Sequence, residues 1–233
     1  GCDQLILIEN DNLTNARLKF FNSDGGESGA CGNGTRCVAD LISKEKGDKT
    51  IILTTPSGNL KSEILENNLV TTEIGIAKTK WNEIPLSGEY DTLNLNIKIN
   101  DINNNEYHGG TAVNVGNPHV IFFMNEIENF EIAKIGPHIE NHKIFPEKCN
   151  VTIAKVMNKN LIKVKVWERG AGLTKACGTA ACATAFAGLL NNLTNKNTDI
   201  EFETGKLSIF IDEKNSIHMK GPVSDIKKIS IKL

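Results

Sequence analysis

The chain has 233 residues, of which 39% are hydrophobic and 23% are charged, and its formal net charge is −2. This length fits one large or two small domains, and the composition is ordinary for a globular chain. The charge offers no basic surface for a phosphate backbone, and only two Trp and two Tyr are available for stacking, which argues against nucleic acid as a partner. The longest apolar run, 180–190, is too short to cross a bilayer, so no membrane partner is expected either.

The first part of the chain predicts a hairpin, a helix and a strand meander. Residues 4–9 and 16–22 are short apolar runs separated by a turn-like Asn-rich segment, as in a β-hairpin. Residues 33–46 have apolar side chains at helical spacing and are followed by Gly47, a typical helix terminator. Three further strands are predicted at 50–53, 59–65 and 69–76.

The pattern weakens between residues 77 and 106, where we place the crossover between two halves, 1–105 and 106–233. In the second half, residues 130–142 are moderately helical, and residues 178–190 are apolar on nearly every face, which predicts a helix wrapped by sheet. Strands are predicted at 107–115, 120–124, 149–156, 161–168, 200–203, 207–212, 216–220 and 226–231.

One short motif occurs twice, as Ala30-Cys31-Gly32-Asn33-Gly34-Thr35 and as Ala176-Cys177-Gly178-Thr179-Ala180-Ala181. The two copies are 146 residues apart, and the register extends to their flanking strands. The sequence therefore predicts an α/β (α+β) protein of two pseudo-symmetric domains. Each domain is expected to be a barrel-like, mostly antiparallel sheet around a central helix, and the two domains are expected to face one another across an active-site cleft.

The repeat places Cys31 and Cys177 where a helix begins, a position that favours thiolate over thiol. Two thiols on opposite faces of one carbon suit racemisation or epimerisation, in which one group removes a proton and the other returns one. One sulfur must then be ionised while the other is protonated, so the two would titrate as a coupled pair.

The chain has six cysteines, an even number that also fits a disulfide framework. Disulfide-dense chains are usually much shorter, and four of these cysteines lie in two predicted helix starts, so we expect no such framework. Cys2, Cys37 and Cys182 are interpreted as small buried hydrophobic residues. No cysteine or histidine spacing matches a zinc site, and no metal is expected.

Four ordered motifs together name a family. They are Cys31-Gly32-Asn33-Gly34-Thr35-Arg36-Cys37, Gly116-Asn117-Pro118-His119, Phe145-Pro146-Glu147-Lys148-Cys149-Asn150-Val151, and Glu168-Arg169-Gly170-Ala171-Gly172 with Ala176-Cys177-Gly178-Thr179 after it. Over essentially the whole chain, these motifs resemble the diaminopimelate epimerase family.

The resemblance implies an enzyme of lysine and peptidoglycan precursor synthesis that interconverts LL- and meso-2,6-diaminopimelate with two cysteines. It implies a small amino-acid substrate, a cytoplasmic location and a possible homodimer. It also implies that no pyridoxal phosphate, metal or nucleotide is required, and no motif for any of these occurs in the sequence.

Carried over by position, the resemblance makes Cys31 and Cys177 the two bases. It places the reacting carboxylate on backbone amides of two pairs, Gly32 with Asn33 and Gly178 with Thr179. It assigns the distal end of the substrate to Asn22, Asn117, Asn150 and Arg169. Glu168 would hold the ammonium group at the reacting carbon, with His119 and Gln4 close by.

Two positions depart from the family pattern, Leu173 where an acidic residue is common and Ala180 where Gly is common. Neither position supplies a group that the reaction needs. Proline racemase and hydroxyproline epimerase resemble the same architecture, but they carry His at the position of Asn33 and Ser-Pro before the second cysteine. A non-catalytic amino-acid-binding module is the alternative from another class.

The repeat also suggests that the chain is an N-terminally shortened piece of a longer protein. Asn150 is preceded in its half by about forty residues that have no counterpart before its partner Gln4. The family usually has a further substrate-contacting Asn in that segment, which cannot be named in this numbering.

Overall fold

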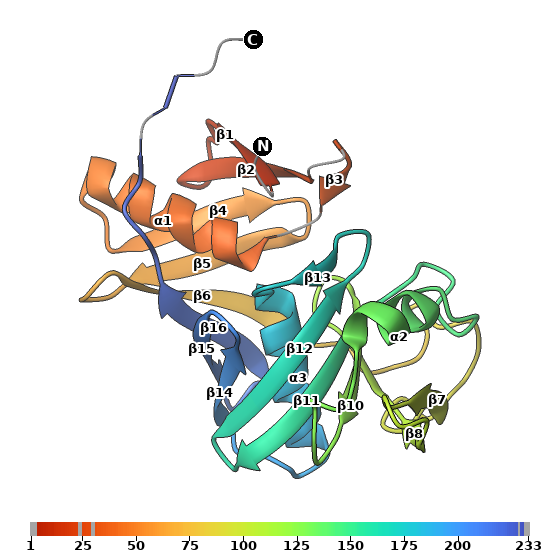
Figure 1. The fold of residues 1–233 in the computed structure, drawn as a ribbon. Helices are drawn as coiled ribbons and strands as arrows, with labels where there is room; N and C mark the ends of the chain where they lie inside the picture. The colour runs from red at the N-terminus through yellow and green to blue at the C-terminus, as the bar shows by residue number, and fades with distance from the viewer. Residues whose placement is uncertain (1–3, 23–24, 29–30, 228, 231–233) are drawn as a thin grey trace. The chain divides into compact units, whose positions relative to one another are not determined.

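A computed structural model describes residues 4–22, 25–28, 31–227, 229 and 230 (Figure 1). The chain forms two compact units: unit 1 is Gly1–Glu73 with Lys220–Leu233, and unit 2 is Ile74–Met219. The division at 105/106 follows the sequence repeat, whereas these units follow contacts within the fold, and the division by repeat stays a prediction. Within the described residues, no helix is long and apolar enough to cross a membrane.

Unit 1 is built on one sheet whose strands come mostly from the predicted hairpin and meander. The hydrogen-bonded order is β1 (Gln4–Glu9), β2 (Ala16–Asn22), β4 (Thr50–Thr55), β5 (Gly58–Ile64) and β6 (Leu69–Ile76), with β3 (Glu27–Ser28) paired to β2. The pairing is antiparallel except between β2 and β4. Alternating side chains such as Leu18, Phe20, Ile51 and Leu53 are fully buried, so one face of this sheet forms the core of unit 1.

Helix α1 (Gly32–Lys46) packs on β4 and β5 through Val38, Ala39 and Ile42 (Figure 1). It ends at Gly47, whose backbone is left-handed (φ 83°) and whose N–H donates to the Ser43 carbonyl. The predicted helix and its terminator are confirmed.

Cys37 does not have the predicted environment. The prediction placed it on the buried face of α1, but the residue is exposed. Cys37 shares a helix face with Lys44, seven residues on and also exposed, whereas Val38, Ala39 and Ile42 form the face that packs on the sheet. Cys182 is buried as predicted, and Cys2 lies outside the described residues.

The main sheet of unit 2 surrounds one helix. Its order is β15 (Gly205–Ile211), β14 (Asn197–Phe202), β12 (Leu161–Glu168), β11 (Asn150–Asn158), β10 (Pro118–Phe123) and β9 (Thr111–Asn114), with β13 (Gly172–Thr174) on β12. Only the β12–β14 and β10–β11 pairs of this set are parallel. Helix α3 (Gly178–Leu190) contacts β9, β10, β11, β14 and β15, and its central residues are buried all round. The predicted apolar helix inside a mostly antiparallel sheet is confirmed.

Two predicted strands differ from the observed ones, and one observed strand was not predicted. The segment 107–115 breaks at Gly110 (φ 109°), where a Cβ atom would lie 3.0 Å from Val120, and it becomes β8 (Glu106–Gly109) and β9. Strand β8 pairs with β7 (Ile97–Asn100), which the weak pattern of that region did not predict. Strand β16 (Ser216–Pro222) is present, but the described residues of 226–231 are in no strand.

Helix α2 (Ile132–Glu140) lies against β11, β12 and β13 in unit 2 (Figure 1). Its closest approach is at Gly136, where an added Cβ would lie 2.4 Å from Trp167 Cγ and 2.6 Å from Cδ2. A glycine is therefore what allows the indole ring to lie directly on the helix.

We expect Gly136→Ala to destabilise the protein, although alanine is the better helix former by about 1 kcal/mol. The new methyl group overlaps three Trp167 atoms at less than 3 Å, and overpacking of this kind costs about 1–3 kcal/mol. Urea unfolding measures the change. Gly109→Ala is the matched control, because its Cβ would have no atom within 4 Å, and it should stay within about 0.5 kcal/mol of the parent. Equal unfolding free energies for the two variants would contradict this account of the packing.

Candidate active site

In unit 1, Cys31 is the N-cap residue of α1. Its backbone is extended (φ −137°, ψ 104°), and its Sγ accepts the Gly34 N–H at 3.3 Å. The Cys31 carbonyl accepts both the backbone N–H and the hydroxyl of Thr35, each at 2.8 Å. The half-buried sulfur thus takes the place that a serine or aspartate oxygen usually occupies at a helix start.

Gly34 leaves room for this arrangement. An added Cβ at residue 34 would lie 2.4 Å from Ile6 Cδ1 and 3.3 Å from Cys31 Sγ. Strand β1 can therefore approach the start of α1 only because residue 34 has no side chain.

The structure also brings together two residues that the family resemblance assigned to the substrate. Gln4 and Asn22 are direct cross-strand partners in the β1–β2 hairpin. This pairing is a backbone register, and it brings the two positions next to each other in the sheet. The turn between β2 and α1 includes residues outside the described part of the chain.

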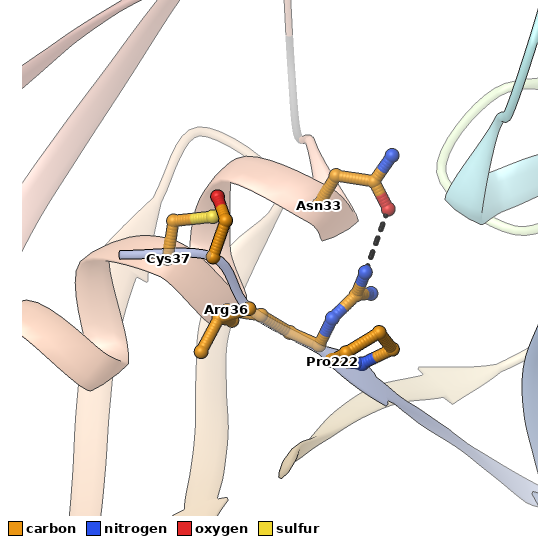
Figure 2. Close-up of a pocket in the computed structure, with 6 residues that line it drawn as sticks. Asn33, Arg36, Cys37 and Pro222 are labelled. Atoms are coloured by element: carbon orange, nitrogen blue, oxygen red, sulfur yellow. Dashed lines mark hydrogen bonds between the residues drawn. The ribbon is translucent and has the colours of Figure 1, made fainter. Parts of the chain in front are cut away.

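A cavity of about 380 Å³ lies beside the first turns of α1 (Figure 2). Its lining residues are Asn33, Arg36, Cys37, Pro222, Val223 and Ser224. Arg36 is 4% exposed, and its Nη2 donates to Asn33 Oδ1 at 2.9 Å. The Asn33 side chain is therefore held by Arg36.

In unit 2, Cys177 repeats the geometry of Cys31 at the start of α3. Its backbone is extended (φ −135°, ψ 116°), and its Sγ accepts the Ala180 N–H at 3.4 Å. The Thr179 hydroxyl lies 3.4 Å from the same sulfur. Gly178 and Thr179 form the first turn, whose leading N–H groups have no partner within the helix.

Cys177 differs from the sequence-based expectation in its acidity. Burial raises the pKa of its thiol, and the nearby Glu168 carboxylate raises this pKa further. The Thr179 hydroxyl and the Ala180 N–H lower the pKa by less. At this cysteine, desolvation outweighs the helix N-terminus, and the protonated thiol is the favoured form.

Next to this site, His119 holds the side chain of Asn117. The histidine is fully buried, and its Nε2 lies 2.8 Å from Asn117 Oδ1, so the ring donates and the amide oxygen accepts. Burial and the nearby Arg169 lower the pKa of His119 to about 3. The imidazole is therefore neutral at physiological pH, and the Asn117 side chain is fixed with its oxygen towards the histidine.

Asn150 joins the first residue of β10 to the residue that follows β12. Its Nδ2 donates to the Pro118 carbonyl at 2.9 Å, and its Oδ1 accepts the Arg169 N–H at 3.0 Å. The Arg169 side chain is exposed, and its Nη1 donates to the Glu147 carbonyl at 2.9 Å. The parallel pairing of β10 with β11 places His119 directly beside Asn150.

The predicted residues therefore form two local groups. Unit 1 contains Gln4, Asn22, Cys31, Gly32 and Asn33, and unit 2 contains Asn117, His119, Asn150, Glu168, Arg169, Cys177, Gly178 and Thr179. Sequence analysis did not single out Gly136, Glu140 or Trp167, which contact one another beside Glu168 in the chain, or the bond from Gly170 N–H to Glu140. A glutamate at the end of a moderately helical segment carries no signal that it will be buried.

The described cysteines, Cys31, Cys37, Cys149, Cys177 and Cys182, are all free thiols, as expected for a chain without a disulfide framework. Within the part of the chain that the structure describes, no group of three or more His, Cys, Asp or Glu side chains could hold a metal ion. The chemistry available at each helix start is that of a thiol, a set of backbone amides and, near Cys177, a carboxylate.

Comparison with known structures shows the fold. A hydroxyproline epimerase from Agrobacterium vitis matches with a TM-score of 0.64 at 11% identity, over 94% of this chain and 71% of that one. A protein from Pseudomonas aeruginosa described as a predicted epimerase matches with a TM-score of 0.65 at 14% identity, over 94% and 80%. The predicted fold class is thereby confirmed.

Comparison of sequences gives the family. The family model for diaminopimelate epimerase matches residues 1–80 and 111–226. The diaminopimelate epimerase of Pelagibacter ubique is 69% identical over 233 residues, which are the whole of this chain and 85% of that protein. The enzyme of Acidiphilium cryptum is 39% identical, over 96% of this chain and 79% of its own length. The chain therefore belongs to the diaminopimelate epimerase family and is a pyridoxal-phosphate-independent isomerase of lysine biosynthesis that acts on diaminopimelate.

Proposed function

We propose that Cys31 and Cys177 are the two acid–base groups of the epimerase reaction. The observation that carries this assignment is their shared geometry, because each cysteine caps a helix with an extended backbone and accepts the N–H three residues ahead. The match is independent of the family resemblance, since Cys37 and Cys182, in the same two helices, lack this geometry.

The two proton transfers then need no acid or base other than the two sulfurs. The thiolate of one cysteine takes the α-proton as the C–H bond breaks, and the electron pair passes into the carboxylate of the substrate. The thiol of the other cysteine donates its proton to the opposite face of the carbon, and the configuration inverts. The N–H groups that begin α1 and α3 are the donors for the carboxylate, whose charge increases as the carbon acid ionises.

Cys177 is proposed as the protonated partner in the free protein, because burial and Glu168 both favour its thiol form. Glu168 also suits the ammonium group beside the reacting carbon. Binding of that ammonium would offset the negative charge of Glu168 and so lower the pKa of Cys177 towards a useful range. The bound substrate would then bring the pKa of Cys177 into the range in which this thiol can act as an acid.

The distal amino acid of the substrate is assigned to Asn22, Asn117, Asn150 and Arg169. Arg169 offers a carboxylate a bidentate fork, and an Asn side chain can serve either an ammonium or a carboxylate. His119 accepts no proton at neutral pH and orients Asn117. Gln4, which pairs with Asn22 in the β1–β2 hairpin, is proposed to lie close to the ammonium group at the reacting carbon.

Two further properties are proposed with this function. Two thiols that share one substrate carbon must stay reduced, which supports a cytoplasmic location. A homodimer is the expected assembly, and size-exclusion chromatography with light scattering tests it.

We expect Cys31→Ser and Cys177→Ser each to reduce the rate of epimerisation by about 10²- to 10⁴-fold, because a hydroxyl group is a far weaker acid than a thiol. Substrate binding should change little, since the backbone donors remain. The rate is measured with LL-diaminopimelate, and binding is measured by calorimetry.

Cys37→Ser is the matched control for these variants, because Cys37 lies on α1 but is exposed and does not cap the helix. It should retain the rate of the parent protein. Equal losses at Cys31, Cys37 and Cys177 would refute the assignment of two bases.

We expect His119 to make the fold sensitive to acid. Its folded pKa of about 3 lies below the ordinary value of 6.5, so below pH 6.5 the unfolded chain binds a proton that the folded protein excludes. The free energy of unfolding therefore falls as the pH decreases from 6.5 towards 3. At about pH 5 the histidine term amounts to about 2 kcal/mol.

His119→Gln is the comparison, because glutamine can donate to Asn117 and does not titrate in this range. Urea unfolding at about pH 7.5 and about pH 5 should show a loss that is smaller in the variant by about 2 kcal/mol. Carboxylate terms are common to both proteins and cancel. An equal loss in both proteins would show that His119 is not buried in its neutral form.

A further inference from the structure

A buried carboxylate group lies behind the proposed binding segment in unit 2. Glu140, the last residue of α2, is 6% exposed. Its Oε2 accepts the indole Nε1–H of Trp167 at 2.7 Å, and its Oε1 accepts the backbone N–H of Gly170 at 3.1 Å. Both carboxylate oxygens are therefore used within the protein.

The residues that carry the two donors flank, in the sequence, the two residues that are proposed to contact the substrate. Trp167 immediately precedes Glu168 and Arg169, and Gly170 immediately follows them. We propose that Glu140 is a positioning residue that fixes the orientation of Glu168 and Arg169 by holding the chain on both sides of this pair. The inference rests on the proposed roles of Glu168 and Arg169.

The segment is the tight turn that joins β12 to β13, whose strands pair up to Glu168 and Gly172. The Ala171 N–H donates to the Glu168 carbonyl at 3.1 Å, and Gly170 is left-handed (φ 75°). Asn150 fixes the backbone of Arg169 from one side. Glu140 fixes Gly170 and the Trp167 ring from the other, so the turn is held at both ends and in the middle.

The energetics favour a specific role for this carboxylate group. A carboxylate at a helix C-terminus faces the negative end of the helix dipole, and burial removes most of its hydration. The Lys148 ammonium is 4.0 Å from Oε1 and compensates only in part. Hydrogen bonds from the two N–H donors stabilise the buried carboxylate. The same two hydrogen bonds hold the turn.

Two residues on one face of α2 contact Trp167. Gly136 and Glu140 are four residues apart and share one face of the helix. The Trp167 ring lies on Gly136, and its N–H reaches Glu140. Helix α2 therefore fixes the side chain of Trp167, the residue that immediately precedes Glu168.

The test compares Glu140→Gln with Glu131→Gln, in which an exposed carboxylate at the other end of α2 is removed. Glutamine keeps one acceptor oxygen but turns an NH₂ group towards the second donor, so the turn loses one of its two holds. We expect the KM for LL-diaminopimelate to rise about 10-fold or more in Glu140→Gln, with a smaller change in kcat. Glu131→Gln should keep both constants of the parent protein.

Trp167→Phe provides a second, milder variant, because it removes one donor and keeps an aromatic ring at this position. Its KM should rise less, and combining it with Glu140→Gln should give less than the product of the single effects. A purely structural defect would instead lower kcat through loss of folded protein and leave KM unchanged. An unchanged KM in both Glu140→Gln and Trp167→Phe would overturn the inference.

Arg169→Lys separates this inference from the proposed function. If Arg169→Lys raises KM while Glu140→Gln does not, the substrate assignment holds and Glu140 has no positioning role. If Arg169→Lys leaves KM unchanged, the assignment of Arg169 to the substrate is itself wrong.

Discussion

The organisation of both units depends on a cysteine that caps a helix. An N-cap residue has an extended backbone and accepts an N–H from the first turn, so it fixes where the preceding strand stops and the helix begins. With sulfur as the acceptor, the same residue also fixes the place of an ionisable group beside unpaired backbone donors. One local constraint therefore positions a thiol and a set of backbone donors together, which is what the proposed acid–base and carboxylate-binding roles require, and the repeat supplies it twice.

The two helix starts are not equivalent environments. Cys31 is half-buried, whereas Cys177 is 5% exposed and lies close to Glu168. A helix N-terminus stabilises a thiolate by about 1 kcal/mol, and full burial can shift a pKa by several units in the opposite direction. Desolvation therefore decides the resting state of Cys177, and a two-base reaction needs this kind of asymmetry, since its partners must begin in opposite protonation states.

Sequence analysis predicted what depends on local periodicity and on the repeat. The hairpin, both capped helices and most strands are confirmed, because each follows from apolar spacing and from Gly or Pro at its ends. The errors lie where distant contacts decide the outcome. Strand 107–115 is interrupted at Gly110, which lies close to Val120, Cys37 is on the face of α1 that does not pack on the sheet, and β7 pairs with β8. Burial of Glu140 depends on a tryptophan 27 residues away.

The contacts around α2 connect the stability of the fold to the geometry of the site. Gly136 admits the Trp167 ring, Trp167 binds Glu140, and Glu140 holds the turn that carries Glu168 and Arg169. Each step is a single close contact, so the position of α2 constrains the position of the turn. Diaminopimelate has a charged amino-acid group at each end of a flexible chain, and a protein that binds both ends needs its binding groups placed accurately. The packing of Gly136, Trp167 and Glu140 against the turn restricts the positions of Glu168 and Arg169 before the substrate binds.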